Sequence, residues 1–288
     1  MNDLNSQEED RRERSSATPG LPQKSRLSRV SAFLFLKLSP FLLLALLVLS
    51  FARPQLIERA RAWIWTNPAE FSDYKGRVNA QVVQERNMPD WCVIFLGDSI
   101  TEGLTVRSIT EEPAMNWGIG KDTTVGILWR LPHYRNLNKA RCIVLAIGIN
   151  DLSHLEEAQI VSNYAKILDA LPPEVPLMCC SVLPINEAVY KQANSTWLNG
   201  RNVTSRRIER LNGLLRDLCD RRPGTRFVET GVLLRDAAGN LRGELTADGL
   251  HPNPLGMQAL MDVLLTNLAK FLAQQKPGST YPATISAE

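Results

Sequence analysis

From Cys92 onward, short apolar runs alternate with stretches of helical periodicity, and this alternation constrains the fold more than any other feature of the chain. We expect buried strands at residues 92–96, 142–147 and 176–182, with weaker ones at 114–117 and 226–229. Apolar residues recur with a 3.6-residue period over residues 160–171, 208–218 and 255–272. Regular alternation of strand and helix is typical of a parallel sheet covered on both faces. The sequence therefore predicts an α/β domain.

The N-terminal part has a different character. Residues 1–29 are polar and predict a disordered basic and polar tail. Residues 30–52 are almost wholly apolar and long enough to cross a bilayer, which allows two interpretations. The segment is either a transmembrane anchor or a signal segment that is cleaved near Ala52. Lys24, Arg26 and Arg29 lie on its N-terminal side, so we expect the rest of the chain to be extracytoplasmic, membrane-anchored or secreted (periplasmic) after cleavage.

The rest of the sequence gives further domain boundaries, and its composition limits the class of protein. We expect a helical linker over residues 53–89, a folded α/β domain over 90–275 and a loose C-terminal tail over 276–288. The formal net charge is only +3, and no basic face large enough for nucleic acid is evident. Four of the five cysteines fall in predicted strands, which favours buried small hydrophobes over disulfides. The sequons at Asn194 and Asn202 matter only in a eukaryotic secretory route.

Four short blocks with chemically useful side chains lie at predicted strand ends or helix edges. They are residues 97–99 (Gly-Asp-Ser), 116–120 (Asn-Trp-Gly-Ile-Gly), 148–151 (Gly-Ile-Asn-Asp) and 248–252 (Asp-Gly-Leu-His-Pro). Open α/β sheets bind ligands at the carboxyl ends of their strands. Ser99 follows the first strand directly, and it is a candidate nucleophile if a base and oxyanion donors lie nearby. Taken alone, a serine in this place is also a common helix N-cap.

A serine nucleophile needs a base, a group that orients the base, and donors for the oxyanion. His251 is the favoured base among three histidines, because Asp248 lies three residues earlier in a glycine-containing loop. His154 is the main competitor, and His133 has no carboxylate near it in sequence. None of them has metal-ligand spacing.

The remaining site predictions concern donors, braces and the pocket. The oxyanion donors expected are the backbone N–H groups of Ser99 and Gly118 and the side-chain amide of Asn150, although glycine and asparagine also occur there simply as turn residues. Asp98 and Asp151 are expected to brace the loops by hydrogen bonds. The side chains expected to wall the substrate pocket are Trp117, Tyr190 and Trp197.

In these four blocks, over roughly residues 90–275, the chain resembles the SGNH (GDSL) hydrolase superfamily. The residues 118–124 (Gly-Ile-Gly-Lys-Asp-Thr-Thr) and 145–151 are similar to the branch of platelet-activating-factor acetylhydrolase-like and lysophospholipase-like esterases. The resemblance implies a three-layer α/β/α sandwich with a five-stranded parallel sheet in order 2-1-3-4-5. It also implies a catalytic triad of Ser99, Asp248 and His251, with Ser99, Gly118 and Asn150 at the oxyanion hole. Ile100 stands where the family commonly has leucine, and this difference touches no catalytic atom.

We therefore expect a serine esterase that uses no metal and no cofactor. Its substrate is a lipid ester or the ester of an acylated small molecule or glycan, and its partner is a membrane, reached through the N-terminal segment. Two alternatives remain open at this point. The same triad can transfer the acyl group to another alcohol, and the same scaffold can be a membrane-tethered module that binds without turnover.

Overall fold

The core of the chain is a five-stranded parallel sheet. The computed structural model describes residues 73–193 and 203–275. The strands are β1 (Val93–Gly97), β2 (Ala114–Gly118), β3 (Cys142–Ala146), β4 (Leu177–Cys180) and β5 (Thr225–Val228). They lie in the order β2-β1-β3-β4-β5, and every neighbouring pair is parallel. The predicted strands and the predicted strand order are confirmed.

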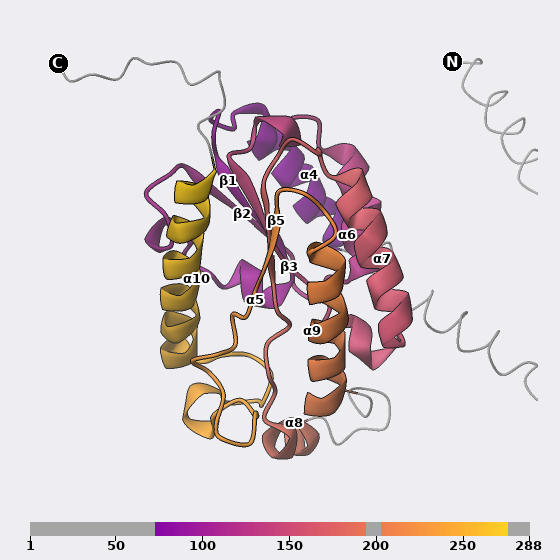
Figure 1. Cartoon of the computed structure of the whole chain (residues 1–288), viewed down its shortest axis with the longest axis vertical. Coiled ribbons are helices and arrows are strands. Elements are labelled where there is room, and N and C mark those ends of the chain that lie inside the picture. The colour runs from indigo at the N-terminus through magenta and orange to yellow at the C-terminus, as the bar shows by residue number, and fades with distance from the viewer. Residues whose placement is uncertain (1–72, 194–202, 276–288) are drawn as a thin grey trace, which may run out of the picture. The chain divides into compact units, whose positions relative to one another are not determined.

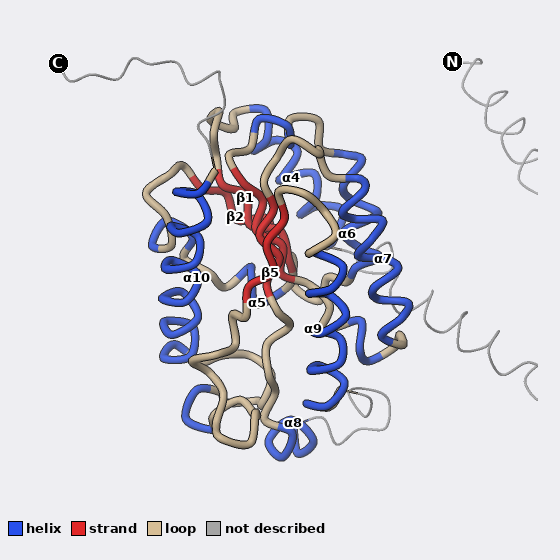
Figure 2. Tube along the Cα trace, viewed as in Figure 1, coloured by secondary structure: helices blue, strands red, loops and turns tan. Residues whose placement is uncertain are grey.

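Helices precede, connect and follow these strands (Figure 2). The α-helices are α4 (Tyr74–Arg86), α5 (Ser99–Glu102), α6 (Thr124–Arg130), α7 (Glu157–Ala170), α8 (Glu187–Ala193), α9 (Ser205–Cys219) and α10 (Pro254–Gln274). Four of them begin at a capping side chain that accepts a backbone N–H: Asp98 accepts from Ile100 N, Thr123 from Gly126 N, Thr204 from Arg207 N, and Asn253 from Leu255 N and Gly256 N. The helices therefore start where the sequence supplies an oxygen for otherwise unpaired N–H groups.

The helices cover both faces of the sheet, with α10 on one side and α7 and α9 on the other (Figure 1). Side chains of β1 alternate accordingly: Val93 and Phe95 pack in the cluster that contains the leucines of α10, whereas Ile94 and Leu96 pack in the cluster that contains α6, α7 and α9. All four are fully buried. Burial on both faces explains why the strand reads as a continuous apolar run.

Helix α4 packs against the domain, although the sequence placed it in a linker over residues 53–89. Its buried side chains hydrogen-bond to residues of the β2–β3 connection. Tyr74 donates to Asp122, Gln81 accepts from Tyr134, and Glu85 accepts the backbone N–H groups that follow Tyr134. The helix has little apolar periodicity because it is held mainly by these polar contacts, and such contacts leave no pattern in the sequence.

Several predictions concern residues outside the described ones. They are the tail over residues 1–29, the membrane or signal segment over 30–52, the tail over 276–288, Trp197 and the sequons at Asn194 and Asn202. These stay predictions.

In residues 73–193 and 203–275, α10 alone has the length and composition of a membrane-spanning helix, but its buried face, including Leu260, Leu264 and Leu268, packs with the sheet. All five cysteines are buried and free, as predicted.

Candidate active site

Ser99 is the first residue of α5, directly beyond the carboxyl end of β1. The Asp98 carboxylate accepts the Ile100 N–H at 3.0 Å and so caps the helix. Gly97 has no room for a side chain, because an added Cβ would lie 2.1 Å from Thr101 Oγ1 and 2.3 Å from the Ala146 carbonyl oxygen. This glycine lets α5 fold back closely against β1 and β3, which leaves the Ser99 hydroxyl at the edge of the sheet.

The structure brings the Ser99 hydroxyl to His251 and Asp248. Ser99 Oγ lies 3.0 Å from His251 Nε2, and His251 Nδ1 lies 2.7 Å from Asp248 Oδ2. The His251 and Asp248 side chains are 46% and 45% exposed, so the site is open to solvent. Burial opposes ionisation of Asp248, but hydrogen bonds from the His251 ring and from two backbone N–H groups outweigh it and hold its pKa below the ordinary value.

The loop that carries His251 has a fixed shape. Gly249 adopts φ 83°, and an added Cβ would lie 2.4 Å from the backbone nitrogen of Tyr190. The Gly249 carbonyl accepts from Asn186 N at 2.8 Å, and Thr246 donates its hydroxyl to the His251 carbonyl at 2.8 Å. The glycine between Asp248 and His251 therefore allows the loop to pack closely against the start of α8.

Two of the three predicted oxyanion donors keep a free hydrogen. The Asn150 amide donates one hydrogen to the Asp122 carbonyl at 2.9 Å, which fixes its orientation and leaves the second hydrogen. The Ser99 N–H lies at the start of α5. The Gly118 N–H differs from the prediction, because it donates to Asn116 Oδ1 at 2.9 Å.

The role of Gly118 in the structure is close packing. An added Cβ would lie 2.2 Å from the backbone nitrogen of Glu102, so this glycine lets β2 approach α5. The Asn116 amide donates to the carbonyls of Thr101 (2.7 Å) and Leu104 (3.0 Å) and ties down the end of α5. Sequence reasoning included Asn116 in the block of residues 116–120 but assigned it no role. Its position two residues before a glycine at the strand end was the available signal.

The three residues predicted to wall the substrate pocket differ in where they lie. Trp117 is fully buried and stacks on Tyr134 with ring centroids 4.6 Å apart, so the prediction that it faces substrate is wrong. Tyr190 is buried between the loops, where it hydrogen-bonds to Ser153, close in sequence to Asn150. Trp197 lies outside the described residues.

The other two histidines lie elsewhere. The ring of His133 lies 4.9 Å from the ring of Trp129, and its side chain is exposed. His154 is half-buried, and burial lowers its pKa. In the described part of the chain, no group of three His, Cys, Asp or Glu side chains is arranged to hold a metal ion.

Arg130, the last residue of α6, holds the backbone beneath the site. Its guanidinium is fully buried and donates to the carbonyl of Gly97 at 3.1 Å and to that of Trp117 at 2.9 Å. It also pairs with the Asp122 carboxylate at 2.8 Å. Asp122 in turn accepts the Asn150 amide on its carbonyl. One arginine thus links the ends of β1 and β2 to the loop that orients Asn150.

Two buried carboxylates brace the loops, as predicted. Asp98 caps α5, and Asp151 accepts from the backbone N–H and the hydroxyl of Thr124. Burial raises the pKa of Asp98 to about 7, and the charges of Asp122 and Asp151 add to this effect. Burial also raises the pKa of Asp151 to about 6.

Asp98→Asn is expected to flatten the pH dependence of stability. Between about pH 4, the ordinary pKa of an unfolded aspartate, and about pH 7, the native state holds a proton on Asp98 that the unfolded state has lost. Unfolding releases that proton, so this group makes stability fall as pH rises through the window. Urea unfolding at pH 5 and pH 8 should show a smaller decline for Asp98→Asn than for wild type, while Asp262→Asn, an exposed control, keeps the full decline. An unchanged decline in Asp98→Asn would contradict the assignment.

Comparisons with known proteins agree with this fold. The mouse platelet-activating factor acetylhydrolase IB subunit alpha1 is 25% identical over 203 residues, which cover 67% of this chain and 82% of the relative. The human alpha2 subunit is 30% identical over 103 residues, 33% of this chain and 45% of the relative. A Streptococcus pneumonia structure described as a platelet activating factor superposes with a TM-score of 0.58 at 26% identity, over 67% of this chain and 93% of that one. A GDSL-like lipase from Bacteroides thetaiotaomicron has the same fold, with a TM-score of 0.56 at 18% identity over 67% and 97% of the chains.

The fold and these relatives define the protein as an α/β enzyme that hydrolyses ester bonds. The chain belongs to the GDSL-like Lipase/Acylhydrolase family, whose model matches residues 95–259.

Proposed function

We propose that this esterase works through an acyl-enzyme on Ser99. The observation that carries the proposal is the continuous chain of contacts from Ser99 Oγ to His251 Nε2 (3.0 Å) and from His251 Nδ1 to Asp248 Oδ2 (2.7 Å). Both distances fit hydrogen bonds. The depressed pKa of Asp248 keeps this carboxylate charged beside the ring that gains a proton during the reaction.

The first half of the reaction forms the acyl-enzyme. Ser99 Oγ attacks the ester carbonyl carbon while His251 Nε2 takes the hydroxyl proton. The carbonyl oxygen becomes an oxyanion, which the Ser99 N–H and the second hydrogen of the Asn150 amide stabilise. When the intermediate collapses, the carbon–oxygen bond to the alcohol breaks, and His251 returns the proton to the leaving alcohol.

The second half releases the acid. Water attacks the acyl carbon, His251 takes a proton from it, and the same donors stabilise the second tetrahedral intermediate. Collapse frees the carboxylic acid and returns the proton to Ser99 Oγ. The exposure of His251 and Asp248 supports hydrolysis, because water reaches the base directly.

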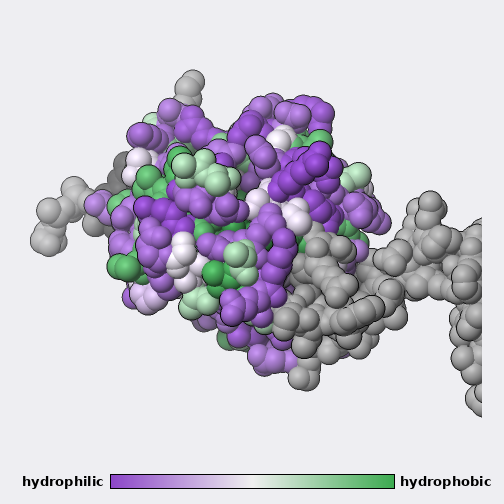
Figure 3. Space-filling view, turned by 90° about the horizontal axis from the view of Figure 1, so that it is seen from below, coloured by the Kyte–Doolittle hydropathy of each residue, from purple (hydrophilic) through white to green (hydrophobic). Residues whose placement is uncertain are grey.

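The substrate we propose is an ester with a small acyl group on a lipid or on an acylated small molecule or glycan. The relatives are named for acetyl hydrolysis of platelet-activating factor, which supports an acetyl-type ester of a lipid. The end of the molecule seen in Figure 3, which carries α8 and the start of α10, shows hydrophobic patches among hydrophilic side chains. Such a surface suits a substrate with both polar and apolar parts.

Asn150→Ala is expected to lower kcat for a short aryl ester by about 10² to 10³, the usual effect of removing one oxyanion donor. KM should change little, because the lost interaction strengthens only as the oxyanion forms. Asn163→Ala is the matched control, since Asn163 donates its amide to Thr124 Oγ1 (2.9 Å), and not to an oxyanion. Steady-state kinetics of both variants check the prediction. Wild-type kcat in Asn150→Ala would remove Asn150 from the mechanism.

A further inference from the structure

Helix α4 lies outside residues 95–259, which the family model matches, and yet it contacts the loop that orients Asn150. Tyr74, its first residue, is buried and donates its hydroxyl to Asp122 Oδ1 at 2.9 Å. The backbone carbonyl of the same aspartate accepts the Asn150 amide at 2.9 Å. A single residue therefore connects Tyr74 to the side chain proposed as an oxyanion donor.

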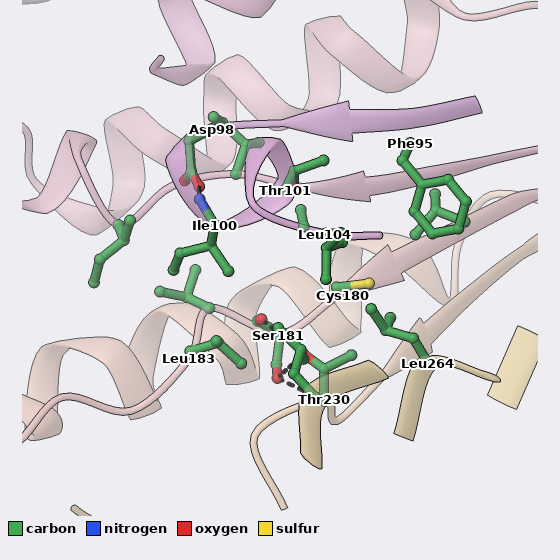
Figure 4. Close-up of a pocket in the computed structure, with 16 residues that line it drawn as sticks. Phe95, Asp98, Ile100, Thr101, Leu104, Cys180, Ser181, Leu183, Thr230 and Leu264 are labelled. Carbon is green, nitrogen blue, oxygen red and sulfur yellow. Dashed lines mark hydrogen bonds between the residues drawn. The ribbon is translucent and has the colours of Figure 1, made fainter. Parts of the chain in front are cut away.

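The two oxyanion donors are held in different ways. The N–H donor at the start of α5 is fixed within its own helix, because the Asp98 carboxylate accepts the Ile100 N–H at 3.0 Å (Figure 4). Asn150 follows β3, and its amide is held by a separate turn between β2 and α6, residues 119–122, which we call the Asp122 turn. The direction of the second amide hydrogen therefore depends on where this turn places the Asp122 carbonyl.

The backbone of the Asp122 turn has a conformation that needs support from its surroundings. Lys121 adopts φ 64°, in the left-handed region that residues other than glycine rarely adopt. The Asp122 N–H closes the turn by donating to the Ile119 carbonyl at 3.1 Å. Such a backbone persists only where neighbouring contacts hold it. Tyr74 and Arg130 supply them, because they bond to the two oxygens of the Asp122 carboxylate, each at 2.9 Å.

The Tyr74 side chain is fixed in the orientation that reaches the turn. Its ring packs in a buried cluster with Ile119, and the ring centroid lies 5.8 Å from that of Trp129. Gly126 on α6 leaves room for the hydrogen bond, since an added Cβ would lie 2.8 Å from the Tyr74 hydroxyl and closer still to the Asp122 carboxylate. Burial and the charge of Asp122 raise the pKa of Tyr74, so the phenol keeps the proton that it donates.

We propose that Tyr74 is a positioning residue of the oxyanion hole and acts on Asn150 through Asp122. The proposal rests on the proposed function, an acyl-enzyme at Ser99 with Asn150 as an oxyanion donor. Without the Tyr74 hydroxyl, the buried carboxylate loses a donor and the Asp122 turn is free to shift. The amide of Asn150 then points less directly at the oxyanion. This interaction strengthens only as the oxyanion forms, so its loss lowers kcat and leaves KM unchanged.

Two variants of α4 form a matched pair. Tyr74→Phe removes only the hydroxyl, and we expect kcat for an aryl acetate to fall about tenfold, a part of the roughly 10² to 10³ lost with a whole oxyanion donor. Glu85→Ala is the control on the same helix, because this buried carboxylate accepts the backbone N–H groups of Arg135 and Asn136, which lie beyond α6 and not in the Asp122 turn. It should lower the free energy of unfolding, but kcat per active site, titrated with a fluorophosphonate, should not change.

A double-mutant cycle separates positioning from general structural support. If Tyr74 acts through Asn150, adding Tyr74→Phe to Asn150→Ala causes no further loss of kcat, because the donor that Tyr74 positions is already gone. A residue that only supports the fold lowers kcat by the same factor in both backgrounds. All four proteins of the cycle are compared as the full chain, with kcat and KM measured on the same aryl acetate.

The outcomes separate this proposal from the function on which it rests. Wild-type kcat in Tyr74→Phe, an equal loss in Glu85→Ala, or the same loss in the Asn150→Ala background would each contradict the positioning role. The proposed function stands in those cases, provided that Ser99→Ala and Asn150→Ala lose activity as expected. Wild-type kcat in Asn150→Ala would remove this donor and the role of Tyr74 together, whereas an active Ser99→Ala would contradict the acyl-enzyme itself.

Discussion

Ser99→Ala is expected to lower kcat for ester hydrolysis by about 10⁶, the loss seen when a triad serine is removed. The change removes the atom that attacks the carbonyl carbon, and the oxyanion donors and the binding surface alone give only a small residual rate. Folding should be unaffected, because Ser99 is partly exposed and the cap of α5 comes from Asp98. Steady-state kinetics on an aryl acetate, together with thermal unfolding, measure both parts of the prediction.

Ser153→Ala is the control for this variant. Ser153 follows Asn150 by three residues and hydrogen-bonds to Tyr190, so it is a second serine close to the loops of the site. We expect its kcat to stay within a few-fold of wild type. Equal losses in the two variants would indicate that the loops, and not the Ser99 hydroxyl, limit the reaction.

Among the variants proposed here, Arg130→Met is expected to lose the most free energy of unfolding, about 3–5 kcal/mol. It leaves the Asp122 carboxylate buried without its charged partner. It also removes the donor shared by the carbonyls of Gly97 and Trp117. Urea unfolding measures the first effect. Arg135→Met, at an exposed arginine, should change the unfolding free energy by no more than about 0.5 kcal/mol.

A double variant tests the cause of this loss. Adding Asp122→Asn to Arg130→Met removes the unpaired charge, so we expect the double variant to be more stable than Arg130→Met alone. Titration of active sites with a fluorophosphonate separates stability from positioning. A purely structural Arg130 would lower the fraction of titratable sites, whereas displacement of the Ser99 and Asn150 loops also lowers kcat per titrated site. A double variant no more stable than the single one would contradict the account.

The strands and the Asp248–His251 pair could be anticipated because each depends on local sequence, whereas the strand order and the meeting of Ser99 with His251 were expected from the resemblance to the family. The buried strand at Val93–Gly97 reads as a continuous apolar run, and Asp248 and His251 lie three residues apart around a glycine. The parallel pairing of β1 and β3 then places the loops that carry Ser99 and Asn150 at the same edge of the sheet. Local sequence was sufficient within each block, but the arrangement of the blocks was expected only from the resemblance.

Three features could not be anticipated for physical reasons. Both faces of a parallel sheet are buried, so the sequence could not tell that Trp117 packs in the core under α6, α7 and α9 and does not face the substrate. A glycine such as Gly118 signals close approach but not which group approaches, and here it is the backbone of α5. Arg130 bonds mainly to backbone carbonyls and one aspartate, and carbonyl acceptors have no sequence signature.

The central claim is that Ser99 is a nucleophile activated by His251, and covalent labelling tests it most directly. The protein is incubated with a fluorophosphonate, digested and examined by mass spectrometry. We predict a stoichiometric adduct on the peptide that contains Ser99, no adduct in Ser99→Ala, and much slower labelling in His251→Ala. Active wild-type enzyme with no adduct, or with the adduct on another serine, would contradict the claim.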